Sequence, residues 1–254
     1  MPVLFLKSLS APRRSESSDF VLACCLAFVA GAVNAGGFLA LRVYTSHMSG
    51  MLASVASFLA RDQLPIALSA VGALLAFMGG AASTTLIVHW AQRQKLTSVY
   101  ALPLLGEAAL LLLFGVLGDQ LNIKLFSTVS FLVVLLGFMM GMQNALITKI
   151  SNFRIRTTHV TGMVTDIGIE LGRLFCSGIA RVGDKDATRA NLVNLGLLAV
   201  LVGQFFAGSL MGAFGFKHFG LLFTVPLAAM LAAVALFPVY DDIRDFFAGF
   251  SPQT

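Results

Sequence analysis

Long apolar runs separated by short polar stretches dominate the chain. An α-helix needs about 20 mostly apolar residues to cross the hydrocarbon core of a bilayer. Six runs approach or exceed that length, at about 20–41, 64–90, 100–118, 123–147, 190–213 and 218–239. This pattern predicts an all-α integral membrane protein with about six transmembrane helices.

Two further segments, 43–60 and 157–180, are long enough to cross but rich in polar residues. Cytoplasmic loops of membrane proteins carry an excess of Lys and Arg, so each topology can be tested by its charge distribution. Six spans with the amino terminus inside place 13 of the 17 basic residues inside, whereas eight spans place only 10 there. We therefore expect six full spans with both termini cytoplasmic.

Composition supports the membrane assignment and excludes other classes. Of the 254 residues, 57% are hydrophobic and 11% are charged, against about 25% charged in a soluble domain. The net charge of +5 comes from residues that flank the apolar runs, so we expect no nucleic-acid partner. No Walker A, G-x-S-x-G or H-E-x-x-H motif is present, and we expect neither an enzyme nor a cofactor.

The two polar segments resemble each other. Ser46-His47-Met48-Ser49-Gly50-Met51 matches 158–163 (THVTGM) at an offset of 112, and Asn34-Ala35 matches Asn144-Ala145 at an offset of 110. Each half then contains a span, a polar segment predicted to be a broken or re-entrant helix, and two more spans. Because each half has an odd number of spans, the second half enters the membrane in the opposite orientation to the first. The sequence therefore predicts two inverted three-span repeats, as in many secondary transporters.

These repeats divide the chain into four parts. A cytoplasmic tail (1–19) precedes the first repeat (20–118), and the second repeat (119–240) precedes a carboxyl-terminal tail (241–254). In that last tail Ile243, Phe246, Phe247 and Phe250 share one helical face, which predicts an amphipathic helix at the membrane interface.

The repeated motifs also resemble those of a known family. Residues 30–35 (AGAVNA) with 46–50 (SHMSG), and 141–145 (GMQNA) with 156–162 (RTTHVTG), are similar to the YoaK-type DUF1275 membrane proteins. The resemblance covers roughly 20–240. It implies a bacterial, multi-pass protein of the plasma (inner) membrane, for which transport is the usual suggestion.

Polar residues within or beside the spans are the candidate substrate-binding or ion-binding residues, because interrupted helices expose backbone groups that need partners. An alternative is that the Ser and Thr side chains only cap helices. Neither histidine of the motifs has a second ligand three or four positions on, so no metal site is predicted. The candidate set is Asn34, Ser46, His47, Ser49, Gln143, Asn144, Thr158, His159, Thr161 and Asp166.

Three charged residues have predicted roles other than substrate binding. Glu107 lies near the middle of a span, where a carboxylate costs at least a few kcal/mol unless it is paired, hydrated or protonated. It is the candidate for proton coupling, the alternative being a protonated side chain that makes one hydrogen bond between helices. Glu170 and Arg173 are spaced for an i, i+3 ion pair, either at a gate or on an amphipathic helix.

Together these features favour a secondary transporter or facilitator for a small molecule or ion, with its site near the membrane midplane between the repeats. A membrane scaffold or sensor without transport activity is the main alternative. A membrane enzyme acting on a lipid or quinone, with His159 and Asp166 as acid and base, is a third. The expected partners are the lipid bilayer, a substrate that the sequence does not identify, and a second copy packed through G-x-x-x-G helix faces.

Overall fold

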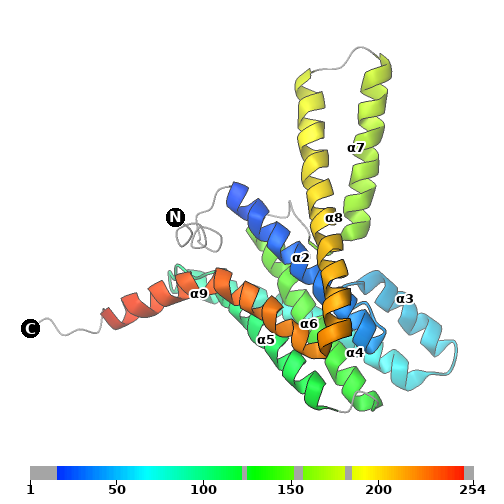
Figure 1. The fold of residues 1–254 in the computed structure, drawn as a ribbon, viewed down its shortest axis with the longest axis vertical. Coiled ribbons are helices and arrows are strands. Elements are labelled where there is room, and N and C mark those ends of the chain that lie inside the picture. The colour runs from blue at the N-terminus through cyan, green and yellow to red at the C-terminus, as the bar shows by residue number, and fades with distance from the viewer. Residues whose placement is uncertain (1–15, 122–124, 152–156, 181–184, 249–254) are drawn as a thin grey trace, which may run out of the picture.

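The computed structural model describes residues 16–121, 125–151, 157–180 and 185–248, and all regular structure within these ranges is helical. The all-α prediction is therefore confirmed. Most of the predicted tail 1–19, and the end of the predicted tail 241–254, lie outside the described residues. The elements are α2 (Glu16–Leu41), α3 (Met48–Leu59), α4 (Leu64–Arg93), α5 (Ala101–Gln120), α6 (Phe126–Ile150), α7 (Val160–Ala180), α8 (Lys185–Phe219), η1 (Gly220–Phe223) and α9 (Thr224–Ala248) (Figure 1).

Five helical stretches are long and apolar enough to cross a membrane. Four of them are α2, α4, α5 and α6. The fifth is 46 residues long and runs from α8 through η1 into α9 (Asn191–Leu236), so the predicted runs 190–213 and 218–239 both fall largely within it. The chain is thus a multi-pass helical membrane protein, and the count of six spans stays a prediction.

The helices pair across the two halves of the chain, where the first half is α2–α5 and the second half is α6–α9. Helix α2 of the first half packs along α8 of the second, and α6 of the second packs along α4 of the first. Helix α5 packs on α9, α3 lies against α4, and α7 lies against α8. Helices α2 and α6 also contact each other and form the most buried part of the fold (Figure 1).

Glycines allow the two main helix pairs to approach closely. A Cβ placed on Gly208 of α8 would lie 1.9 Å from the carbonyl oxygen of Phe28 on α2. A Cβ on Gly80 of α4 would lie 1.9 Å from the carbonyl oxygen of Phe138 on α6. No side chain larger than hydrogen fits at either point, which is typical of close contacts between membrane helices.

The G-x-x-x-G faces bear on the predicted association with a second copy. Gly137 and Gly141 lie against α4, and Gly208 with Gly212 lies against α2, so contacts within the chain occupy both faces. On α7, nothing lies within 4 Å of a Cβ placed on Gly168 or Gly172. The first two faces therefore serve folding of the single chain.

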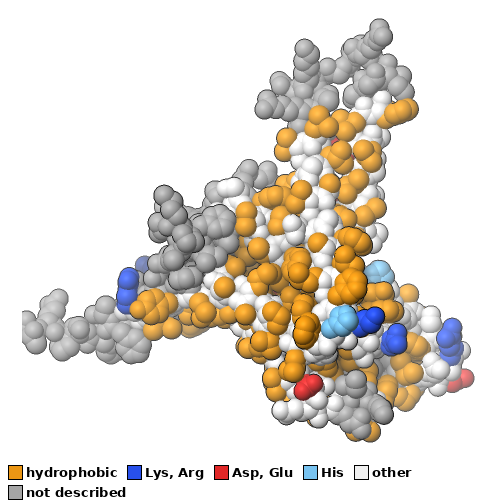
Figure 2. Space-filling view, in the orientation of Figure 1, with side chains coloured by type: hydrophobic (Ala, Val, Ile, Leu, Met, Phe, Trp, Pro, Cys, Tyr) orange, Lys and Arg blue, Asp and Glu red, His pale blue; other side chains and the backbone are white. Residues whose placement is uncertain are grey.

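Helix α7 and the first half of α8 project from the rest of the protein (Figure 1). Apolar side chains cover much of their visible surface (Figure 2). The exposed apolar residues of these two segments include Val164, Ile169, Leu171, Phe175, Leu192 and Val193. A bilayer would solvate these side chains, because lipid tails are as apolar as they are. At the other end of the chain, α9 continues through the start of the predicted interfacial tail, and the interfacial position itself stays a prediction.

Candidate functional site

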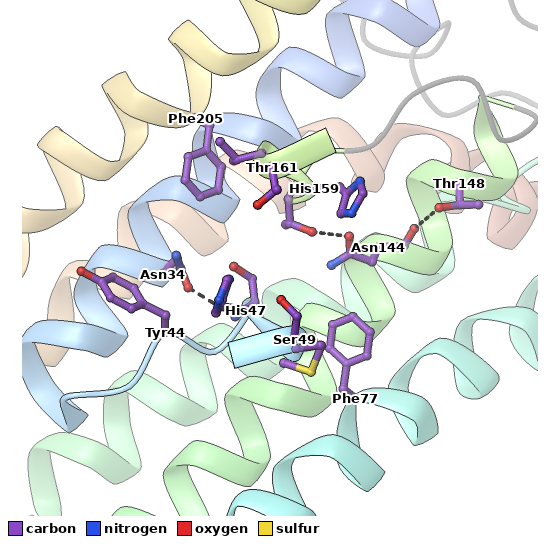
Figure 3. Close-up of a pocket in the computed structure, with 14 residues that line it drawn as sticks. Asn34, Tyr44, His47, Ser49, Phe77, Asn144, Thr148, His159, Thr161 and Phe205 are labelled. Atoms are coloured by element: carbon purple, nitrogen blue, oxygen red, sulfur yellow. Dashed lines mark hydrogen bonds between the residues drawn. The ribbon is translucent and has the colours of Figure 1, made fainter. Parts of the chain in front are cut away.

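The two polar motifs meet at one cavity of about 760 Å³. They approach it from opposite halves of the chain, at the starts of α3 and α7 (Figure 3). The lining residues are Asn34, Tyr44, Ser46, His47, Met48, Ser49, Phe77, Asn144, Thr148, Thr158, His159, Val160, Thr161 and Phe205. The set includes eight of the ten predicted binding residues.

In the first half, an asparagine holds the turn that leads into α3. The side chain of Asn34 on α2 accepts a hydrogen bond from the backbone N–H of Ser46, with 3.3 Å between nitrogen and oxygen. This bond fixes the polar turn against α2, so that His47 and Ser49 follow at the edge of the cavity (Figure 3).

In the second half, the equivalent asparagine makes more hydrogen bonds. Asn144 on α6 accepts a hydrogen bond from the hydroxyl of Thr158, and its Nδ2 donates to the carbonyl oxygen of Met140 at 2.7 Å. The hydroxyl of Thr148 donates to the backbone carbonyl of Asn144 at 2.7 Å. The bond between Thr158 and Asn144 therefore ties the turn before α7 to α6.

Each motif histidine immediately precedes a helix. The backbone carbonyl of His47 accepts the N–H of Met51 at 2.9 Å, and that of His159 accepts the N–H of Met163 at 3.1 Å. Helix α3 has no side-chain capping hydrogen bond at its amino end, so the capping interpretation is not supported there.

The glycine of each motif has a steric role beside the histidine. A Cβ on Gly50 would lie 2.0 Å from the imidazole Cδ2 of His47, and a Cβ on Gly162 would lie 2.4 Å from Nδ1 of His159. The imidazole therefore occupies the space over the first helical turn that any other residue would fill. This explains why histidine and glycine occur together at the same spacing in both halves.

A threonine precedes each histidine motif and is fully enclosed. Thr45 and Thr157 are 1% and 0% exposed, and neither hydroxyl has a hydrogen-bond partner within the described part of the chain. The two turns therefore match in burial as well as in sequence.

Aromatic side chains complete the cavity, and sequence reasoning missed them. Phe77 comes from α4 and Phe205 from α8, the helices that follow the motif segments. Tyr44 stacks on Phe38 with ring centroids 4.4 Å apart. The repeat gave no signal for the two phenylalanines, because at the offset of 112 Phe77 aligns with Arg189 and Phe205 aligns with Arg93.

Two predicted binding residues do not line the cavity. The Nε2 of Gln143 donates to the carbonyl oxygen of Leu26 at 3.2 Å, inside the contact between α6 and α2. Asp166 is exposed on α7. Their assignment to a binding site stays a prediction.

The residues predicted for coupling and gating also lie away from the cavity lining. Glu107 on α5 is only 1% exposed, and its Oε2 has no hydrogen-bond partner among the described residues. Glu170 accepts a hydrogen bond from Arg173 at 3.2 Å and another from Asn194 of α8 at 3.0 Å. The i, i+3 ion pair is formed, and a second bond ties Glu170 to the neighbouring helix. A role for the pair in a gate stays a prediction.

Comparison with known proteins places the chain in a family. The sequence profile described as "Protein of unknown function (DUF1275)" matches residues 22–237. The chain belongs to this family. The matched range contains both histidine motifs, both asparagines and every residue that lines the cavity.

One relative carries a descriptive name. The chain is 28% identical over 152 residues to the UPF0700 transmembrane protein YoaK of Bacillus subtilis (strain 168), an alignment that covers 59% of this chain and 66% of that protein. The aligned part is thus slightly less than two thirds of YoaK. No solved structure matches the chain. Membership of the DUF1275 family supports the membrane assignment and leaves the activity to be argued from the site.

Proposed function

We propose that this protein is a secondary transporter or facilitator for a small molecule or ion, with its binding site in the 760 Å³ cavity. One observation carries the proposal: two motifs 112 residues apart in the sequence line the same cavity from opposite halves. Transporters built from internal repeats bind their substrates at the repeat interface, where helices are interrupted. In this proposal the breaks before α3 and α7 serve as such interruptions.

The proposal includes an inverted arrangement of the halves. Gly208 of α8 approaches Phe28 of α2 closely, and Gly80 of α4 approaches Phe138 of α6 in the same way. This is expected if one symmetry operation maps α2 onto α6 and α8 onto α4. Because α3 is only 12 residues long, we treat the motif helices as re-entrant and count three crossings per half. Both termini would then be cytoplasmic, in the plasma membrane of a bacterium.

The described cavity lining suits a small polar ligand. It offers amides from Asn34 and Asn144, imidazoles from His47 and His159, and several hydroxyls. Pockets of a few hundred Å³ with a few convergent polar groups are typical small-molecule sites. Phe77, Phe205 and Tyr44 would shape the cavity around an apolar part of the ligand.

Proton coupling by Glu107 is a separate part of the proposal. Its carboxyl group is enclosed between helices and does not line the cavity, so any coupling would act through the packing of α5. A Glu107→Gln variant keeps the size of the side chain and removes its titration. Ligand-induced thermal stabilisation, measured in a screen of metabolites and ions at two pH values, should lose its pH dependence in that variant and keep it in Asp119→Asn.

Cysteine accessibility tests the cavity directly. In a background without Cys24, Cys25 and Cys176, Ser49→Cys and Thr161→Cys should react with a water-soluble thiol reagent in sealed vesicles. Because both residues line the same cavity, alternating access predicts that the two cysteines react from the same side of the membrane, one side at a time.

The matched control is Leu75→Cys, an exposed position on α4 that does not line the cavity. A lipid-facing thiol at this position should stay unreactive. If Ser49→Cys and Thr161→Cys are equally unreactive, the cavity is not an aqueous path, and the scaffold interpretation is favoured.

A further inference from the structure

A second cavity of about 410 Å³ lies where α2 ends and α4 and α6 begin. It shares Tyr44 and His47 with the first cavity. Most of its remaining lining is apolar. The apolar lining residues include Met51, Phe58, Ile66, Val129 and Val133.

One cationic side chain belongs to this cavity. Arg42 directly follows α2, with a backbone φ of 60°, and is exposed. Within the described part of the chain its guanidinium forms no ion pair and donates no hydrogen bond. An unpaired cation beside an apolar cavity attracts a ligand that has both an anionic and an apolar part.

A hydroxyl inside the cavity is also available. The Oγ of Ser130 is shielded from solvent and has no hydrogen-bond partner among the described residues. Serines in helices commonly bond the carbonyl four residues earlier, as Ser83 and Ser209 do here. Ser130 is an exception, so it can bond a polar group of a ligand without losing an existing bond.

The position of the cavity at the ends of three helices favours a membrane lipid as this ligand. Helix α2 ends at Leu41, α4 begins at Leu64 and α6 begins at Phe126, and all three helices are candidate membrane spans. The ends of spans lie at the level of the lipid headgroups. Basic pockets between transmembrane helices bind anionic headgroups.

We propose that this second cavity is a binding site for an anionic phospholipid, with the headgroup phosphate at Arg42 and an acyl chain among Phe58, Ile66 and Val133. The bound lipid would lie against Tyr44 and His47, and so against a wall of the first cavity. The proposal goes beyond transport and does not require it. A scaffold with the same fold would bind the lipid equally well.

Native mass spectrometry of the full chain in detergent tests the proposal with two lipids of identical chains, phosphatidylglycerol and phosphatidylcholine. We expect wild type to retain phosphatidylglycerol about fivefold better, the effect of one basic residue near an anionic headgroup. Arg42→Gln should abolish that preference. Arg61→Gln, an exposed basic residue that does not line the cavity, should keep it.

A second pair of variants tests the apolar part. Ser54 lines the cavity, whereas Ser57 is exposed on the same helix and bonds only the carbonyl of Ala53. Ser54→Phe should displace the lipid, and Ser57→Phe should not. If Ser54→Phe does not fold, the arginine pair decides alone.

Three results would overturn the proposal. Wild type could retain the two lipids equally, or Arg42→Gln and Arg61→Gln could lose the preference to the same extent. A free fatty acid of the same chain length could also displace phosphatidylglycerol at equimolar concentration, which would make the cavity a fatty-acid site.

Discussion

The two halves of the protein present the same motif to the cavity but continue differently behind it. Helix α3 ends at Leu59 after 12 residues, whereas α7 continues for 21 residues to Ala180. At the offset of the motif, Phe58 aligns with Glu170 and Arg61 with Arg173. The first half has an apolar cavity there, and the second half has an ion pair bonded to Asn194.

This difference separates what the site requires from what each half can vary. Asparagine, histidine and glycine recur because each has a steric or hydrogen-bonding role at the cavity. The residues one or two turns further on have no contact with the cavity, so they could diverge. Mutation of a shared residue should therefore destabilise the protein in either half, by an amount that follows the contacts and hydrogen bonds of that residue.

The largest expected effect concerns the glycine contacts between helices. Gly80→Ala and Gly208→Ala each place a Cβ 1.9 Å from a backbone carbonyl oxygen, which backbone movement must relieve. We expect each to lower the free energy of unfolding by at least about 2 kcal/mol. Thermal unfolding in detergent measures the loss.

Gly203→Ala is the control, because nothing lies within 4 Å of its Cβ on α8. It should be neutral or slightly stabilising, since alanine favours helix by up to about 1 kcal/mol over glycine. A large loss in Gly208→Ala with none in Gly80→Ala would show that the two helix pairs are not equivalent.

The next effect distinguishes the two asparagines. Asn144→Ala removes bonds to Thr158 and Met140, whereas Asn34→Ala removes the longer bond from Ser46. At about 1 kcal/mol per hydrogen bond, we expect losses of about 2 and about 1 kcal/mol, respectively, by thermal unfolding. Equal losses would mean that the extra bonds in the second half contribute nothing.

How much of this could be read from the sequence depends on the kind of feature. Predicted spans 64–90 and 100–118 end within a few residues of α4 and α5, because a bilayer demands long apolar runs. Eight of the ten polar residues singled out from the sequence line one cavity. The motif carried that information because both copies keep the same residue types at the same spacing.

Side-chain direction within a span could not be predicted. In an apolar run such as that around Phe77 or Phe205, all helical faces have similar composition, and packing alone decides which residue meets the cavity. Gln143 shows the same limit: it adjoins Asn144 in sequence, yet it points into the contact between α6 and α2. Neighbours on a helix differ by about 100° in direction.

A smaller effect is expected for the ion pair that only the second half has. Asn194→Ala removes the bond to Glu170 from α8, and we expect a loss of about 1 kcal/mol. Arg173→Gln should cost less, because the arginine side chain is 59% exposed and exposed pairs contribute little. If Arg173→Gln lowers the free energy of unfolding more than Asn194→Ala does in thermal unfolding, the ion pair is shielded from water in the membrane.

The smallest effect concerns the turns that connect the last two helices of each half. Between α8 and α9 the turn is η1, which begins at Gly220 with a φ of 60°. Between α4 and α5 the turn is held from outside by Asp242 of α9. Its Oδ1 accepts the N–H and the hydroxyl of Thr97 at 2.9 and 2.6 Å, and its Oδ2 accepts the N–H of Ser98 at 2.8 Å.

These hydrogen bonds make the contribution of Asp242 to the stability of the protein depend on pH. Partial burial alone would raise the pKa of Asp242, but the hydrogen bonds from Ser98 and Thr97 outweigh it and lower the pKa below the usual 3.8. A carboxylate with a lowered pKa in the folded state stabilises the protein above its unfolded pKa, and that contribution is lost as pH falls through the folded pKa. The contribution should therefore be complete at pH 7 and decline below about pH 4.

Asp242→Asn should lower the free energy of unfolding at pH 7 by less than about 1 kcal/mol, because the site is partly open to solvent. The difference in Tm between wild type and this variant should shrink as pH falls from 5 to 3. Asp119→Asn, at the end of α5 and without a described hydrogen bond, should show no such convergence. A difference that persists unchanged at pH 3 would mean that the shape of the side chain, and not its charge, holds the turn.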